Sequence, residues 1–159
     1  MWAKEYFMEG KRIRVRAIII LDGKLVSMYR ERQGRIFYTF PGGGMEENET
    51  AEECLKREVF EEFGLVINPI KKVYIYENQY SIEHFYIAEW ILGEFGSGYG
   101  EEFQENNKNG VYIPKFIEIS KIPDLPLMPP EVAQSFYDDF MKNNKFVRKD
   151  VKFLIGEIK

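Results

Sequence analysis

Hydrophobic positions along the chain fall into short apolar runs separated by glycine, proline and polar turns, which predicts a fold rich in β-strands. These runs predict strands over residues 12–21, 24–30, 36–40, 65–76, 81–92 and 111–119, with a final strand or tail over 151–158. The pair Asp22-Gly23 between the first two runs is a strong hairpin signal. Two further segments predict helices, one starting near Thr50 and one running from Pro130 to about Asn143. Strands mixed with two helices imply an α/β fold in which helices pack on a sheet.

Both ends of the first helix carry cap signals. Thr50 followed by Glu53 forms a capping-box pattern, so we expect the helix to begin there. Gly64 stands where the C-terminal glycine of a helix belongs. Cys54 is the single cysteine of this sequence, which therefore has no intramolecular disulfide framework. Because Cys54 falls inside the helix, we interpret it as a small packing residue.

Three glutamates of this helix have the spacing of a metal site. Glu58, Glu61 and Glu62 stand at i, i+3 and i+4, so they share one side of the helix. Glu58 and Glu62 point into the same sector as Ala51 and Leu55, which we expect to be the buried stripe. Carboxylates so close together repel one another unless a cation holds them, and hard oxygen ligands favour magnesium, manganese or calcium over zinc. The other glutamates of this region are expected to be solvated: Glu46, Glu47, Glu52 and Glu53.

The helix belongs to a longer motif over residues 43–65. This segment has the form G-x5-E-x7-R-E-U-x-E-E-x-G-U, where U is a bulky apolar residue, and every fixed position is filled. It therefore resembles the signature of the Nudix hydrolases, also called MutT-like proteins. The resemblance implies a Nudix-type α/β/α sandwich around a mixed β-sheet, formed by a single domain over residues 1–159.

The resemblance also implies roles for the motif residues. Glu58, Glu61 and Glu62 would hold Mg²⁺, or Mn²⁺ in its place, and take part in catalysis. In the family, the arginine that matches Arg57 orients the catalytic glutamates through ion pairing. We favour this role over that of an ordinary surface arginine, with Glu49 as the partner of Arg57.

The glycine run before the helix has two interpretations. Glycines let the backbone approach a ligand closely, so Gly43 and Gly44 are candidates for contact with the substrate. In the family, the carbonyl of the residue just before the motif glycine often binds the metal, and that residue is Gly42 here. The alternative is a plain tight turn after a strand.

Candidate residues outside the motif rest on weaker patterns. Arg30 and Arg32 follow the second strand and suit phosphate recognition, although a solvated turn is the competing interpretation. Family members also recruit a distant acidic residue, and a glycine-rich stretch favours Glu102 over Glu101 as an extra ligand or base. His84 is the single histidine, and nothing in the sequence places a nucleophile beside it. Four aromatic residues could stack on a base or belong to the core: Tyr38, Phe85, Tyr86 and Tyr112.

Composition narrows the class of partner. The 159 residues suit one domain with a sizeable core, and the net charge of −4 argues against general nucleic-acid binding. Small phosphorylated ligands remain compatible, because a bound metal can reverse the local charge. The sequence has no apolar run of 18 residues and no recognisable signal peptide, so we expect no membrane association and a cytoplasmic location.

Together these features predict a metal-dependent hydrolase that cleaves the pyrophosphate bond of a nucleoside diphosphate linked to another group. The general base would be Glu61 or Glu62, or Glu102 in its place. Three alternatives stay open: a diphosphatase of oxidised nucleoside triphosphates, an RNA 5′-end pyrophosphohydrolase, which the acidic charge disfavours, and a nucleotide-sensing protein of the same fold. ADP-ribose is disfavoured, because residues 78–81 lack the proline that the family's ADP-ribose subgroup usually places there.

Overall fold

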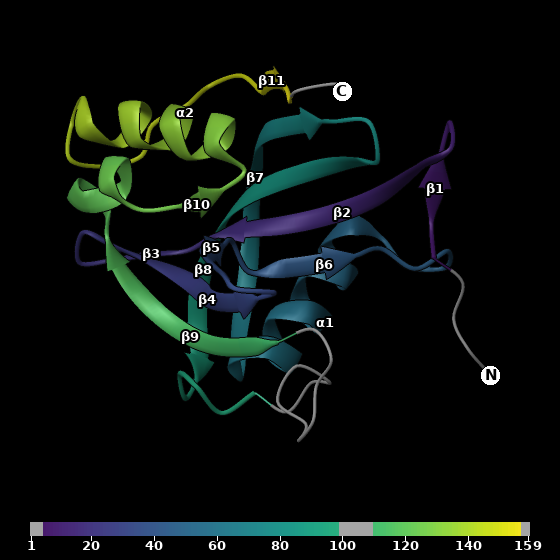
Figure 1. Cartoon of the computed structure of the whole chain (residues 1–159), viewed down its shortest axis with the longest axis horizontal. Helices are drawn as coiled ribbons and strands as arrows, with labels where there is room; N and C mark the ends of the chain where they lie inside the picture. The colour runs from purple at the N-terminus through teal and green to yellow at the C-terminus, as the bar shows by residue number, and fades with distance from the viewer. Residues whose placement is uncertain (1–4, 99–109, 157–159) are drawn as a thin grey trace.

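Alternate side chains of the strand β2 (Lys11–Ile18) face opposite sides of their sheet, and this alternation sets the layers of the molecule. Val15 and Ala17 pack in a buried cluster with the helix α1 (Ala51–Phe63). Ile18 packs in a second cluster with the helix α2 (Pro130–Met141). The two helices therefore lie on opposite sides of the strands, with α2 at the top of the view (Figure 1). This computed structural model describes residues 5–98 and 110–156 and confirms the expected α/β/α sandwich.

Two sheets form the middle of the sandwich. Besides β2, the first contains β1 (Phe7–Met8), β6 (Gly42–Gly44), β7 (Leu65–Glu77), β8 (Ser81–Gly93) and β11 (Lys152–Ile155). Its order is β1-β2-β8-β7-β11, with β6 paired to β2. The sheet is mixed, because β8 runs parallel to β2 and antiparallel to β7.

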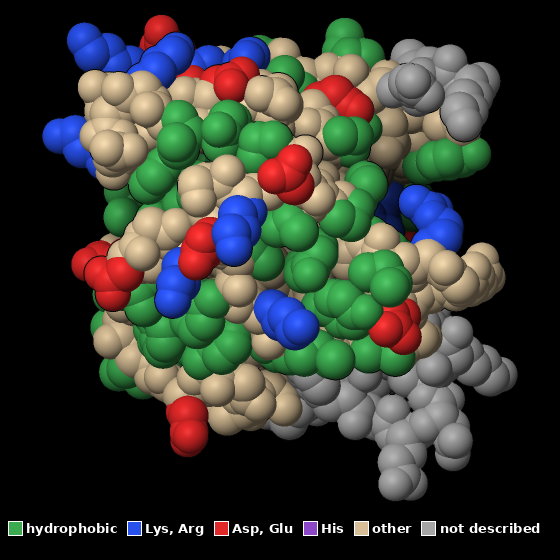
Figure 2. All heavy atoms as spheres, turned by 60° about the vertical axis from the view of Figure 1, so that its left-hand side comes forward, with side chains coloured by type: hydrophobic (Ala, Val, Ile, Leu, Met, Phe, Trp, Pro, Cys, Tyr) green, Lys and Arg blue, Asp and Glu red, His purple; other side chains and the backbone are tan. Residues whose placement is uncertain are grey.

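The second sheet lies against the first and extends the layer. Its strands are β3 (Ile20–Leu21), β4 (Lys24–Arg32), β5 (Arg35–Thr39), β9 (Val111–Glu118) and β10 (Leu127–Met128). The order is β10-β5-β4-β3, with β9 paired to β4. A 3-10 helix, η2 (Ile119–Asp124), leads from β9 towards β10 and α2. On the side of the molecule that carries α2, β3 and β9, hydrophobic side chains are interspersed with single charged ones (Figure 2).

The expected caps of α1 are confirmed. The Thr50 hydroxyl accepts a hydrogen bond from the Glu53 N–H, and the Glu53 carboxylate accepts one from the Thr50 N–H. Gly64 ends the helix in the left-handed conformation with φ of 74°. The second helix begins at Pro130, as expected. Among the described residues, neither helix is long and apolar enough to span a membrane.

Some predicted elements differ from the structure. The strand expected over 12–21 is confirmed except at Ile19, where it is interrupted because the chain passes there from the first sheet to the second, between β2 and β3. The glycine run forms the short strand β6, since its backbone pairs with β2 at Arg14, Val15 and Arg16. The sequence patterns also missed β1, β10 and η2. The strand β10 forms by long-range pairing with β5, whereas β1 is a two-residue strand in a tight hairpin with β2 and η2 is a short 3-10 helix. The final segment contains β11, which pairs with β7.

Candidate functional site

Gly43 and Glu58 are in close contact where β6 meets α1. A Cβ atom added to Gly43 would lie 2.5 Å from the Glu58 Cδ and 2.6 Å from each carboxylate oxygen. The carboxylate of Glu58 thus fills the space that any larger residue at position 43 would occupy. This contact gives Gly43 a structural reason for being glycine, and it places Glu58 directly beside the glycine loop.

Glu62 is held against the same loop by a different contact. The Gly42 N–H donates a hydrogen bond to the Glu62 Oε1 at 2.9 Å, and Glu62 is 7% exposed. Gly42 has φ of +139°, and a Cβ there would lie 2.0 Å from the Val15 carbonyl oxygen, so this position requires glycine. The expectation that Glu58 and Glu62 border the buried stripe of α1 is confirmed by their placement.

Arg57 is surrounded by carboxylates. It forms a bidentate pair with Glu49, from Nη2 to Oε1 at 2.7 Å and from Nε to Oε2 at 3.1 Å. Its Nη1 also lies 3.0 Å from the Glu58 Oε1 and 3.6 Å from the Glu61 Oε2, and its Nη2 lies 3.8 Å from the Glu46 Oε1. The expected pair of Arg57 with Glu49 is therefore confirmed. Four carboxylates share one guanidinium, which leaves an excess of negative charge at this end of the loop.

The same contacts shift two protonation equilibria. Burial tends to raise the pKa of Glu49, but hydrogen bonds from Arg57 and from the Glu46 N–H outweigh it and lower that pKa below its ordinary value. The hydrogen bond to Glu49 raises the pKa of Arg57, and the charge of Glu58 adds to this effect. Both partners are thus charged at neutral pH, and Arg57 also contacts Glu58, which is the contact that the predicted orienting role requires.

Arg16 is a site residue that the sequence patterns missed. Its Nη1 donates to the Gly42 carbonyl oxygen at 3.1 Å and to the Phe40 carbonyl oxygen at 3.3 Å, while its Nε donates to the Glu83 Oε1 at 2.9 Å. Burial tends to lower the pKa of Arg16, but the charge of Glu83, the hydrogen bond to Glu83 and the charges of Glu62 and Glu58 together outweigh burial and raise the pKa. The carbonyl expected to face a metal therefore already accepts a hydrogen bond from a guanidinium. The available signal was the alternation of arginines along the first strand.

Arg30 lies between two aromatic rings on the side of β4 that faces the motif. Its Cζ is 3.5 Å from the Tyr112 ring centroid and 5.5 Å from the Phe37 ring centroid. Burial lowers the pKa of Arg30, and the charge of Glu62 is among the neighbours that act on it. Arg32 is exposed at the β4–β5 hairpin, where it lines a cavity of about 360 Å³, and no hydrogen bond or ion pair joins it to the motif within the described residues. The structure thus brings Arg30, but not Arg32, towards the glutamates.

The remaining candidates divide between the core and the site. Phe85 is fully buried and Tyr86 is 8% exposed, so the suggestion that they stack on a base is wrong: both belong to the core clusters. Tyr38 and Tyr112 are partly buried. His84 has a buried Nδ1 that has no hydrogen-bond partner in the described structure. Within the part of the chain that the structure describes, the Nδ1 of His84 therefore lacks the carboxylate that orients a histidine acting on a nucleophile.

Glu101 and Glu102 lie outside the described residues. The nearest described residue before them is Gly98, which packs on the C-terminal end of α1. A Cβ at Gly98 would lie 2.4 Å from the backbone carbonyl of Glu62 and 2.5 Å from the Glu61 carbonyl oxygen. Gly98, the last described residue before this segment, therefore lies at the C-terminal end of the motif helix.

The donors around Gly43 fit a divalent cation in kind and in charge. All of them are oxygen atoms, and the carboxylates outnumber the guanidiniums beside them. Within the described residues, no three His, Cys, Asp or Glu side chains are already gathered around one point. The reason is that Glu58 and Glu61 point towards Arg57, whereas Glu62 points towards the Gly42 N–H. Metal binding would require these side chains to turn towards a common centre.

Comparison with known proteins gives a family match and several relatives. A family model described as the NUDIX domain matches residues 10–139. An RNA pyrophosphohydrolase of Pasteurella multocida is 40% identical over 67 residues, and one of Histophilus somni is 34% identical over 67 residues. Each match covers 42% of this chain, and it covers 33% and 34% of the two relatives, so the chain spans about a third of the curated relatives it matches.

Solved structures resemble the fold as a whole. A NUDIX hydrolase from Nitrosomonas europaea has a TM-score of 0.68 at 15% identity, with 94% of this chain and 82% of that chain covered. An ADP-ribose pyrophosphatase from Streptococcus suis has a TM-score of 0.59 at 19% identity, with 89% and 98% covered. At these identities the likeness concerns the fold alone.

Proposed function

The chain belongs to the NUDIX family, and from this premise we propose that it is a divalent-metal-dependent hydrolase of a nucleoside diphosphate linked to another group. The bond cleaved would be the pyrophosphate bridge. The products would be a nucleoside monophosphate and either pyrophosphate or a phosphorylated leaving group.

The observation that carries this proposal is the pair of contacts between the glycine loop and α1. The Glu58 carboxylate occupies the side-chain space of Gly43, and the buried Glu62 accepts a hydrogen bond from the Gly42 N–H. Two carboxylates are thus held against a loop whose backbone can approach a phosphate closely. Burial of a charged group costs free energy unless the group is paired or serves a ligand, and here the Gly42 N–H and the nearby charge of Arg16 hold the Glu62 carboxylate at the loop.

We assign the proton transfer to a motif glutamate. A bound divalent cation would offset the charge of the substrate phosphates and lower the pKa of the attacking water. Glu61 or Glu62 would accept the proton of that water, with Glu102 as the alternative outside the described residues. Arg57 would hold Glu58 in place through its bonds to Glu49 and Glu58.

Arg30 is the proposed contact for the substrate on the other side of the loop. Its guanidinium plane, together with Tyr112 and Phe37, offers charge for a phosphate and flat surfaces for a base. Oxidised nucleoside triphosphates remain an alternative substrate class. A second candidate is the 5′ end of RNA, because relatives named RNA pyrophosphohydrolase share the motif region.

The test is a screen of substrates in Mg²⁺ or Mn²⁺, read by phosphate release after phosphatase coupling. The panel contains nucleoside triphosphates with and without an oxidised base, ADP-ribose, other nucleotides linked through a diphosphate, and 5′-triphosphorylated RNA. Direct attack of water on phosphorus predicts one ¹⁸O atom in a phosphate product when the reaction runs in labelled water. A single-turnover experiment with excess enzyme must then detect no phosphoryl-enzyme.

Matched variants on the same helix separate a catalytic glutamate from a structural one. Glu62→Gln is expected to lower turnover by roughly a hundredfold or more while the fold survives, because its position beside Gly42 is retained but its charge is lost. Glu52→Gln removes an exposed carboxylate from α1 and should keep turnover. Turnover that is equal in both variants would contradict the mechanism. No turnover on any substrate would favour a nucleotide-sensing protein.

A further inference from the structure

The backbone of Gly42 lies between two side chains of opposite charge. Its N–H donates a hydrogen bond to the Glu62 Oε1 at 2.9 Å, and its carbonyl oxygen accepts one from the Arg16 Nη1 at 3.1 Å. The contact with Arg16 follows from the β2–β6 ladder, in which Arg16 and Gly42 stand opposite each other. The loop carbonyl that the family resemblance assigns to a metal is therefore already in contact with a positive charge.

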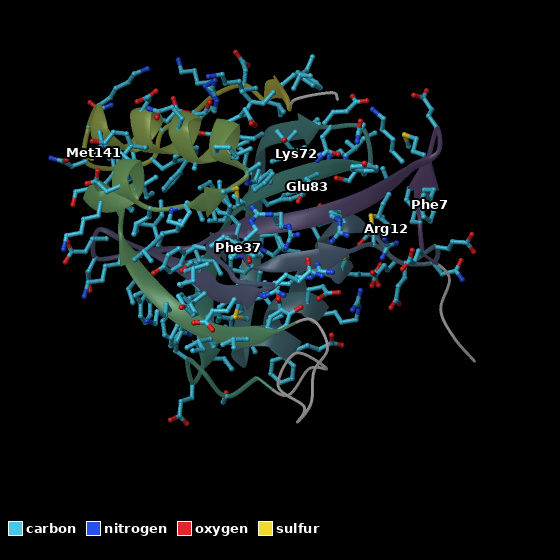
Figure 3. All side chains as sticks on the ribbon, in the orientation of Figure 1. Phe7, Arg12, Phe37, Lys72, Glu83 and Met141 are labelled. Carbon is cyan, nitrogen blue, oxygen red and sulfur yellow. The ribbon has the colours of Figure 1, made fainter. Side chains whose placement is uncertain are left out.

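Glu83 on β8 holds Arg16 at this carbonyl. The Arg16 Nε donates to the Glu83 Oε1 at 2.9 Å, and the two side chains are only 17% and 11% exposed. Glu83 lies beside β2 in the sheet (Figure 3), because β2 and β8 pair in parallel. The Arg16 Nη1 also donates to the Phe40 carbonyl oxygen at 3.3 Å. Separating a buried guanidinium from a bonded carboxylate is costly, so these contacts fix Arg16 beside the loop.

The charge of Arg16 also acts on the motif glutamates. Burial lowers the pKa of Arg16, whereas Glu83 and then the charges of Glu62 and Glu58 raise it above its ordinary value. This attraction is mutual, so Arg16 stabilises the charged forms of Glu62 and Glu58. Arg57 contacts Glu58 as well. Two guanidiniums thus offset the charge that a bound cation would otherwise offset.

A divalent ion at the Gly42 carbonyl would share one oxygen atom with Arg16. A carbonyl oxygen has two lone pairs, but two cations on the same oxygen lie close enough to repel each other strongly. Burial of the Arg16–Glu83 pair leaves little solvent to screen this repulsion. The ion and the guanidinium therefore compete for the oxygen, and Glu83 favours the guanidinium by keeping it in place.

We propose that Arg16 is a positioning residue that competes with the divalent ion for the Gly42 carbonyl, and that Glu83 holds Arg16 in that position. This inference rests on the metal dependence in the proposed function and deepens it. The metal affinity of the site is then set by two side chains of β2 and β8, both outside the motif. Binding of the ion requires the Arg16 guanidinium to move away from the Gly42 carbonyl.

The test measures Mn²⁺ binding to the nucleotide-free protein by calorimetry, with free Mn²⁺ followed by electron paramagnetic resonance. Arg16→Met removes the charge and every donor, so the dissociation constant should fall roughly tenfold or more, as for the loss of a charge-assisted contact. Glu83→Gln removes the carboxylate that offsets Arg16, so Mn²⁺ should bind roughly threefold to tenfold more weakly.

The double variant Arg16→Met/Glu83→Gln separates the contact from the charge. It removes one positive and one negative charge, so net charge alone predicts no change, whereas loss of the contact predicts binding roughly threefold or more tighter than wild type. The double variant leaves no unpaired charge at position 83, so it gives the answer even where Arg16→Met fails to fold. Thermal unfolding of each variant checks the fold.

Arg14→Met is the matched control. It removes a positive charge from the same strand, at a residue that stands opposite Gly44 rather than Gly42. Its Mn²⁺ affinity should rise by less than about twofold at an ionic strength of about 0.15 M, where charges without direct contact are largely screened.

Tighter Mn²⁺ binding in the double variant, with little change in Arg14→Met, supports the competition, also where the wild type binds too weakly to measure. Wild-type affinity in the double variant overturns it, as does an equal gain in Arg14→Met or no Mn²⁺ binding by any of the proteins. The hydrolase assay is read separately. Turnover in Mg²⁺ with unchanged Mn²⁺ affinity in the double variant rejects this inference alone, whereas tighter Mn²⁺ binding without turnover on any substrate rejects the proposed function alone.

Discussion

Replacing Gly43 with alanine separates the stability of the fold from the geometry of the site. The three atoms nearest to the added Cβ all belong to the Glu58 carboxylate, at 2.5 to 2.6 Å. Ordinary carbon contacts lie at about 3.5 Å or more, so the carboxylate must move by about 1 Å. Gly43 does not have positive φ, so alanine fits its backbone conformation. The strain can therefore relax through one flexible side chain.

This geometry predicts a change in activity larger than the change in stability. A displacement of about 1 Å in a catalytic group lowers turnover by about a hundredfold, which corresponds to about 2.7 kcal/mol of transition-state free energy. The free energy of unfolding should change by less than about 1 kcal/mol, because no backbone or core contact is lost. Urea denaturation measures the stability, a Mg²⁺-dependent assay on the best substrate measures turnover, and calorimetry with Mn²⁺ measures the metal affinity.

Gly23→Ala is the matched control with the opposite signature. Gly23 has φ of +73° and no atom within 4 Å of an added Cβ, so alanine there costs backbone strain of about 1–2 kcal/mol without a clash. Gly23 lies in the turn between β3 and β4. The turnover of Gly23→Ala should therefore match that of the wild type. Full turnover and unchanged Mn²⁺ affinity in Gly43→Ala would refute the reasoning, since Glu58 would then need no fixed place beside the loop.

Three further predictions test other parts of the structure. Glu49→Gln removes the charge that holds Arg57, so turnover should fall roughly tenfold while a thermal scan still shows one cooperative transition; unchanged turnover would argue against the orienting role. Burial, with a smaller effect of Lys72, lowers the pKa of His84 from 6.5 to about 4. Between these two pH values the unfolded chain therefore binds a proton at His84 that the folded chain does not bind. The free energy of unfolding should therefore fall as the pH is lowered from 7 to 4. The fall is at most about 3 kcal/mol, and it is smaller because the ring is partly exposed. Urea titrations of His84→Gln should show a smaller fall than those of the wild type. Phe136→Ala opens a cavity under α2 and should lower the free energy of unfolding by about 3–5 kcal/mol; a loss below 1 kcal/mol would mean that this core cluster is dispensable.

Local patterns were sufficient for the motif helix. The capping box from Thr50 to Glu53, the end at Gly64 and the shared side of the glutamates all follow from contacts within a few residues along one helix. The pair of Glu49 with Arg57 spans eight residues and was equally accessible. The sequence by itself therefore determined which carboxylates share this side of the helix and which arginine pairs with them.

Only the tertiary structure decided what these carboxylates face. The bond from the Gly42 N–H to Glu62 depends on the pairing of β6 with β2, which the glycine run does not signal. Arg16 contacts the Gly42 carbonyl across 26 residues, and Arg30 meets Tyr112 through the β4–β9 register. Such contacts are set by strand register over long separations, whereas hydrophobic periodicity specifies only which face of a strand is buried. The alternation of arginines along β2 is a property of the sequence, but the bond between Arg16 and Glu83 depends on the register of β2 with β8.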